Sequence, residues 1–116
     1  MSIDGLCGVV TGDELRPATL RDLSAFGLRV ERAFDPRTAR RVVQLEIELP
    51  GIDEVIWARG EVTRALLVPL AGRTAEGEPR FWCHAGMRIA GIARREWRLL
   101  RDYVRSTTQL QHPAVS

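Results

Sequence analysis

Residues 41–49 read Arg-Val-Val-Gln-Leu-Glu-Ile-Glu-Leu and carry the clearest pattern in the chain. Aliphatic residues alternate with mostly polar ones, so the aliphatic set shares one face of a β-strand. The members of this set are Val43, Leu45, Ile47 and Leu49. Pro50 and Gly51 end the strand, because proline lacks the ladder donor and glycine permits a turn. The segment predicts a half-buried strand.

The same alternation continues through the second half of the chain. Residues 56–68 alternate apart from a break at Arg64, and Gly60 marks an expected bend. Residues 69–80 are mostly polar and predict a long hairpin tip, after which residues 81–89 resume strict alternation. We therefore expect the two segments to pair across the tip.

Three further strands are predicted nearer the N-terminus, and one helix at the C-terminus. Residues 17–24 and 27–34 are strand segments joined at Ala25 and Phe26, and residues 5–11 form a weaker strand because two glycines lower its propensity. At about 100° per residue, one apolar arc opposes an arginine-rich face in the last segment. The arc consists of Trp97, Leu99, Leu100, Tyr103 and Val104. Six strands and one amphipathic helix predict a small antiparallel barrel or sandwich.

Composition bounds the domain organisation and the cellular compartment. With 116 residues, 45% of them hydrophobic and 28% charged, the chain is one foldable domain and not a multidomain enzyme. We expect the domain to span residues 1–105 and residues 106–116 to be a flexible tail, since they carry no apolar period. The charge-free apolar stretch of residues 65–72 is short and contains Pro69, so no membrane-spanning or secretory segment is predicted. We expect a cytoplasmic protein with free thiols at its two cysteines.

Charge is distributed unevenly along the chain. All 17 basic residues are arginine, and six of them lie in residues 88–105 against two acidic residues. The planar guanidinium suits phosphate, carboxylate and guanine edges better than an ammonium group does. The missing lysine is also explained by a compositional bias of the genome.

The most informative polar residues lie between two predicted strands. Asp22 and Ser24 are two positions apart on a strand end, so their side chains project to the same side. Gly27 follows in the turn, where the backbone can take a positive φ or let a ligand approach closely. Either these groups form a ligand site or they satisfy the amides of the turn.

This pattern resembles a PilZ domain. The resemblance rests on the Asp-x-Ser-x-x-Gly of Asp22, Ser24 and Gly27, on residues 28–30, and on residues 86–89 before a basic helix. It covers about residues 5 to 105. PilZ domains are six-stranded antiparallel β-barrels of bacteria, and many receive cyclic di-GMP and act on motility, pili or exopolysaccharide. The resemblance implies an all-β fold, a six-stranded antiparallel barrel with a C-terminal amphipathic α-helix.

The second nucleotide-binding element of that family, an Arg-x-x-x-Arg segment ahead of the first strand, is expected to be missing. Counting back from Asp22 by one strand and one loop reaches Met1, and the first basic residue is Arg16. Arg16 and Arg21 come too late to be that pair, although either of them, or Arg29, is a candidate to contribute a charge. Losing two charge-assisted contacts of roughly 1.5 to 3 kcal/mol each weakens binding by about a hundredfold to ten-thousandfold.

The resemblance therefore implies a non-catalytic adaptor that acts through a protein partner in bacterial motility, polarity or cell-surface signalling. No cofactor is expected, and cyclic di-GMP is at most a weak ligand. The alternative is a cyclic di-GMP receptor that uses Asp22, Ser24 and Gly27 with non-standard arginines.

Two surfaces are candidates for contact with the partner. Trp57 and Trp82 lie on the polar sides of two strands that are expected to be neighbours, where they form an aromatic contact patch or are shielded by the helix or a loop. The helix carries an arginine face, which is either solvated or a landing site for an acidic partner or anionic lipid. Its candidate residues are Arg94, Arg98, Arg101 and Arg105. Nucleic acid is not the expected partner.

Neither a catalytic nor a metal site is predicted. Ser24 lacks the strand-to-helix elbow of hydrolytic nucleophiles and has no histidine nearby in sequence. Cys83 and His84 are adjacent on a strand, so they face opposite sides and do not ligate one metal ion. We expect Cys83 to be a core residue.

Overall fold

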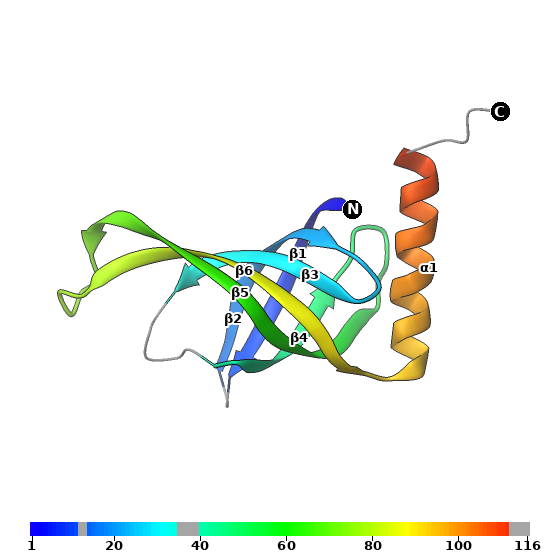
Figure 1. The fold of residues 1–116 in the computed structure, drawn as a ribbon, viewed down its shortest axis with the longest axis horizontal. Coiled ribbons are helices and arrows are strands. Elements are labelled where there is room, and N and C mark those ends of the chain that lie inside the picture. Colours follow the sequence, from blue (N-terminus) through cyan, green and yellow to red (C-terminus); the bar gives the residue numbers. More distant parts are fainter. Residues whose placement is uncertain (12–13, 35–39, 112–116) are drawn as a thin grey trace.

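The computed structural model describes residues 1–11, 14–34 and 40–111. Six antiparallel strands close into a barrel in the order β1-β2-β3-β6-β5-β4. The strands are β1 (Ser2–Thr11), β2 (Glu14–Leu23), β3 (Gly27–Phe34), β4 (Val42–Glu48), β5 (Val55–Arg73) and β6 (Pro79–Ile92). One helix, α1 (Arg94–Gln111), follows β6 and stands beside one end of the barrel (Figure 1). The predicted fold class is confirmed.

Alternation places the core where the sequence predicts it. The aliphatic set of residues 43–49 is buried, and Leu45 and Ile47 are completely inaccessible to solvent. Val9 of β1, Leu20 of β2 and Val30 of β3 fill the same interior. Because a closed barrel joins its first and last strands, each strand contributes one face to a single core.

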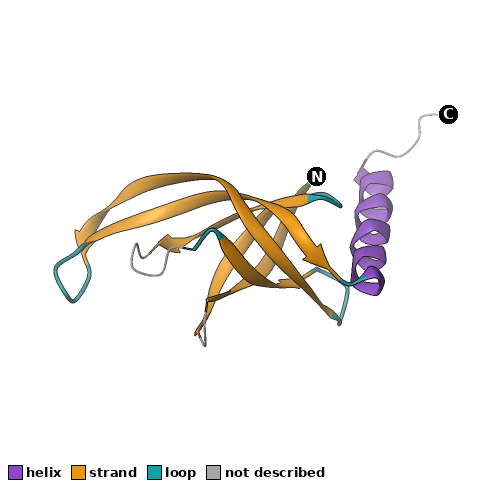
Figure 2. Ribbon diagram, turned by 60° about the horizontal axis from the view of Figure 1, so that its bottom comes forward, coloured by secondary structure: helices purple, strands orange, loops and turns teal. Residues whose placement is uncertain are grey.

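The β5–β6 hairpin differs most from the sequence expectation. The predicted polar tip of residues 69–80 is wrong, because β5 continues to Arg73 and β6 begins at Pro79. Beyond the pair Val42–Glu61, β5 has no strand on its outer edge within the described residues. The two strands project from the barrel as a long twisted ribbon, which we call the arm (residues 63–80; Figure 2).

The helix is docked through its apolar arc. Leu100 is fully buried, and Leu99, Tyr103 and Val104 are partly buried against the core. The helix runs to Gln111, so residues 106–111 continue it, while the domain boundary at residue 105 and the flexibility of the tail stay predictions. Residues 112–116 lie outside the described part of the chain.

Candidate functional site

The turn between β2 and β3 is held together by Ser24. Its hydroxyl oxygen accepts hydrogen bonds from the amides of Phe26 (3.2 Å) and Gly27 (3.1 Å), and the hydroxyl lies 3.3 Å from the Gly27 carbonyl oxygen. The Ser24 amide donates to the same carbonyl at 2.8 Å. A serine hydroxyl that satisfies successive turn amides fixes the turn locally. This is the structural role that the sequence analysis weighed against a ligand site.

Asp22 lies in the same turn and is bound by a cation. Its Oδ1 is 2.9 Å from the α-ammonium group of Met1 and accepts a hydrogen bond from the Leu23 amide at 3.0 Å. Arg29 approaches the other carboxylate oxygen to 3.9 Å. The hydrogen bond from the Met1 ammonium group, followed by its charge, lowers the pKa of Asp22. The carboxylate is therefore ionised and already partnered.

Gly27 is required here for a reason other than a positive φ. Positive φ values occur at Gly51, Gly72 and Gly77, whereas Gly27 is not in the left-handed region. A Cβ placed on Gly27 would instead lie 2.7 Å from the Met87 carbonyl oxygen of β6, closer than real Cβ atoms approach. The turn therefore needs glycine because the backbones of β3 and β6 come very close.

A groove of about 550 Å³ opens beside this turn. Asp22, Ser24, Gly27 and Arg29 line it, so the structure brings four of the predicted ligand residues together. Arg64, Thr63, Gly86 and Met87 line the facing wall, and the sequence analysis did not assign them to the site. Arg64 interrupts the alternation of β5 at a register shift. In the sequence, this break in the alternation was the feature that could have identified Arg64 as a site residue.

The other two predicted arginines lie elsewhere. Arg21 pairs with Glu31 on the outer face of the barrel. It lines a neighbouring hollow that shares Arg29, Arg64 and Gly86 with the groove. Arg16 pairs with Glu14 at 3.2 Å, near the opposite end of β2 from Asp22. Neither residue lines the groove.

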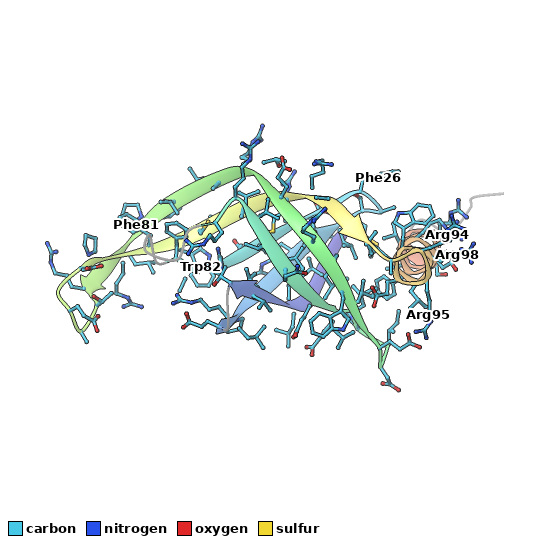
Figure 3. All side chains as sticks on the ribbon, turned by 90° about the horizontal axis from the view of Figure 1, so that it is seen from below. Phe26, Phe81, Trp82, Arg94, Arg95 and Arg98 are labelled. Carbon is cyan, nitrogen blue, oxygen red and sulfur yellow. The ribbon has the colours of Figure 1, made fainter. Side chains whose placement is uncertain are left out.

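The arginine face of α1 is only partly open to solvent. Arg94 and Arg98 are exposed and point away from the barrel (Figure 3), and Arg105 is also exposed. Arg101 lies 5.0 Å from the centroid of the Trp97 ring and pairs with Asp102. Its guanidinium group is therefore engaged by side chains of the same helix. Arg95, which lies beside this face, pairs with Glu54 at 3.1 Å.

The two tryptophans do not form one patch. Trp57 is half exposed and is paired with Glu46 of β4, whereas Trp82 is partly buried and is paired with Val68 far along the ribbon. Their strands are neighbours, as predicted, but the register separates the two rings. Alternation in the sequence predicts on which face of a strand a residue lies. It does not predict which residue of the neighbouring strand lies opposite.

An apolar surface that the sequence analysis missed lies on the arm. Leu66 is 61% exposed, and three more aliphatic side chains there are exposed. They are Leu67, Val68 and Leu70. The signal was the charge-free run of residues 65–72, in which strict alternation fails after Leu66. The alternation is lost here because the arm projects beyond the barrel, so neither face of its strands packs against the core.

The two cysteines and the histidine of β6 show no clustering. Cys83 is buried in the core, as predicted, while His84 points outward and pairs with Glu31 at 2.7 Å. Within the described residues, no three side chains of metal-ligating type gather at one place. The described helix lacks the long uncharged apolar stretch that crossing a bilayer requires.

Comparison with known proteins identifies the fold. No family model matches the sequence, and no curated protein matches it. Among solved structures, the PilZ domain of Escherichia coli YcgR with cyclic di-GMP superposes with a TM-score of 0.68 at 14% identity, over 99% of this chain and 95% of that chain.

Two further structures superpose over nearly the whole chain. The Bacillus subtilis inhibitor of motility MotI/DgrA gives a TM-score of 0.69 at 19% identity, over 98% of this chain and 51% of that chain. Borreliella burgdorferi PlzA in complex with cyclic di-GMP gives 0.61 at 6% identity, over 99% and 49%. The chain thus spans about half the length of these two proteins. Its closed six-stranded antiparallel barrel with a C-terminal helix is a PilZ-like fold.

Proposed function

We propose that the chain is a non-catalytic PilZ-type regulator that acts through a protein partner in bacterial motility or cell-surface behaviour. The observation that carries this proposal is the set of exposed aliphatic side chains on the arm, of which Leu66 is the most exposed. Contiguous apolar side chains in solvent are typical of protein contact surfaces. The similarity of the fold to an inhibitor of motility supports the same kind of role.

The geometry of the groove supports weak rather than tight nucleotide binding. Asp22 and Ser24 already hydrogen-bond within the protein, and of the three arginines proposed from the sequence only Arg29 lines the groove. A ligand must displace these internal contacts before it gains its own, which lowers its net affinity. We infer that cyclic di-GMP does not bind in the micromolar range.

A cyclic di-GMP receptor is the second candidate function. The groove favours it, because Arg29 and Arg64 offer guanidinium groups beside the Asp22–Gly27 turn. Guanidinium groups bind phosphate oxygens bidentately and hydrogen-bond guanine edges. The related folds of YcgR and PlzA were both solved with cyclic di-GMP.

Two measurements separate the candidates. Calorimetric titration with cyclic di-GMP at moderate salt is expected to show no saturable binding at micromolar concentrations. In capture from the native cell extract, the double variant Leu66→Ser/Val68→Ser should lose the partner, and Asp22→Ala/Ser24→Ala should keep it.

The opposite pattern would establish the receptor. A dissociation constant at or below about a micromolar, abolished in Arg64→Ala, would replace the adaptor by the nucleotide receptor. Retention of the partner by the arm variant would show that the arm is not the contact surface.

A further inference from the structure

A further hollow opens to solvent beside the end of β3 and shares no lining residue with the groove at Asp22. It has a volume of about 310 Å³ and is bounded by the end of β3, the residues that enter β4, and facing parts of β5 and β6. Most of its wall is apolar. Phe34, Val62, Cys83 and Ala85 are among the residues that form that wall.

Arg32 lines this cavity and is the buried charged residue of the described core. Its side chain follows Leu28 and Val30 on the inner face of β3, and the residue is only 7% exposed. Its Nε atom is buried and has no hydrogen-bond partner, and no acidic side chain of the described residues pairs with it. Arginine stays protonated in proteins, so this position holds a positive charge that no carboxylate of the described residues neutralises.

Other features around Arg32 also favour a negatively charged ligand. Burial is the main cause that lowers the pKa of Arg32, and the nearby charge of Arg16 lowers it further. Arg40 and Arg41 also line the cavity, and Arg41 lies 3.5 Å from Glu61. A buried charge is costly unless an opposite charge and hydrogen bonds compensate it. Among the described residues that line the hollow, Arg32 therefore places a positive charge without a hydrogen-bonded partner at its Nε atom against an apolar wall.

The shape and the charge together restrict the ligand. A volume of about 310 Å³ lies in the range of pockets that bind small organic molecules. One guanidinium group on the wall of the hollow matches a single carboxylate, which it binds through two parallel hydrogen bonds. The apolar wall matches a hydrocarbon body. A dianionic phosphate would need more donors than Arg32 supplies, and Arg41 of the same wall is already paired with Glu61.

We propose that this cavity binds a small monocarboxylate with an apolar chain, whose carboxylate group pairs with Arg32 and whose chain lies against the walls of β5 and β6. Such a ligand neutralises the buried charge and fills the hollow at the same time. The site is separate from the groove and independent of the function proposed above.

Octanoate is the probe, and calorimetry with thermal unfolding of the whole chain provides the readouts. Octanoate should bind and raise the unfolding temperature, because a ligand of the folded state stabilises it. Octan-1-ol and octylammonium, which have the same chain without the negative charge, should bind at least about tenfold more weakly. Octyl phosphate distinguishes a carboxylate from a phosphate site and should also bind more weakly.

Arg32→Met is the decisive variant. It should fold, because it replaces an unpaired buried charge with an apolar side chain of similar length, and it should lose octanoate affinity by at least about tenfold. Arg95→Met, on the exposed side of α1, is the matched control and should bind octanoate like the wild type.

Amide chemical shifts provide a test that does not depend on the variant folding. Octanoate should move the resonances of Val62, Cys83 and Ala85 and leave those of Ser24 and Gly27 in place. The proposal is overturned if octanol binds as well as octanoate, if Arg32→Met retains the affinity, if the shifts gather at Ser24 and Gly27, or if octanoate does not bind.

Discussion

The indole Nε1 of Trp97 donates a hydrogen bond to the carbonyl oxygen of Ala25, 3.3 Å away, and so joins α1 to the turn between β2 and β3. The turn is attached to the barrel as well, because the Ile89 amide donates to the Phe26 carbonyl at 2.8 Å. Phe26 itself is 74% exposed and lies beside the helix (Figure 3). The helix and the Asp22–Gly27 turn therefore form one structural unit.

Replacing Trp97 should loosen this unit. Trp97→Ala removes a large, partly buried ring and is expected to cost about 3 kcal/mol, the low end of the range for such substitutions. The unfolding temperature should fall by about 4 °C for each kcal/mol in a domain of this size. Trp97→Phe keeps the ring but removes the hydrogen bond, and should cost about 1 kcal/mol.

Trp57→Ala is the matched control for that experiment, since Trp57 is 50% exposed and does not contact the turn through a hydrogen bond. It should lower the unfolding temperature much less. Equal unfolding temperatures for Trp97→Ala and the wild type would show that the helix is not docked through this residue.

Gly27→Ala should destabilise the fold. The added Cβ would meet the Met87 carbonyl oxygen at 2.7 Å, and backbone atoms cannot move aside without displacing β6. Overpacking of this kind costs about 1 to 3 kcal/mol. Gly86→Ala is the control in the same groove, because its Cβ would have no neighbour nearer than 3.7 Å. Thermal unfolding of both variants tests the prediction, and a neutral Gly27→Ala would contradict the close approach of β3 and β6.

The Gly27 case shows what the sequence could and could not predict. Alternation in residues 41–49 and 81–89 was sufficient for the strands, their inner faces and the core, because period two directly reports which side is buried. Of the two reasons offered for glycine at position 27, a positive φ is wrong, while close approach of a ligand stays a prediction. The close contact depends on how β3 and β6, which are far apart in sequence, pair with each other. That register cannot be read from the sequence alone.

The same limitation explains the incomplete site. The short spacing between Asp22, Ser24 and Gly27 placed them together, as expected for neighbours around one turn. Arg64 joins them from β5 only because a register shift between Val62 and Arg64 turns it toward the groove. Arg16, by contrast, was grouped with them by its distance along the chain, although an antiparallel strand carries it to the other end of the barrel.

The ionisation of Asp22 should make stability depend on pH. Because the hydrogen bond from the Met1 ammonium group lowers the pKa of Asp22 in the folded state below its unfolded value of about 3.9, the folded state binds this proton less tightly than the unfolded state. The stabilisation is therefore present above about pH 4 and lost as the pH falls through the lowered pKa.

Thermal unfolding between about pH 2 and pH 7 measures this effect. Asp22→Asn should unfold at a lower temperature than the wild type near neutral pH, and the difference should shrink in acid. Ser24→Ala is the control, because it removes turn hydrogen bonds without removing a carboxylate and should shift the curve by a similar amount at every pH. A constant difference for Asp22→Asn would contradict the ion pair.

Both cysteine thiols should be inert in the folded protein. Burial raises the pKa of Cys7 to about 12 and also raises the pKa of Cys83, so neither forms the reactive thiolate near neutral pH. Alkylation at pH 8 followed by mass spectrometry should label neither residue until denaturant is added. Rapid labelling of Cys7 in the native state would show that β1 opens without global unfolding.

The aliphatic residues of the arm should contribute to binding and not to stability. Leu66 is 61% exposed, so Leu66→Ser should change the free energy of unfolding by no more than about 0.5 kcal/mol. Leu45 has the same side chain but is completely buried between the strands, and Leu45→Ala should cost about 2 to 5 kcal/mol. Denaturant titration of the two variants makes the comparison directly. If Leu66→Ser were as destabilising as Leu45→Ala, the arm would be part of the folded core, and its aliphatic surface would not be available to a partner.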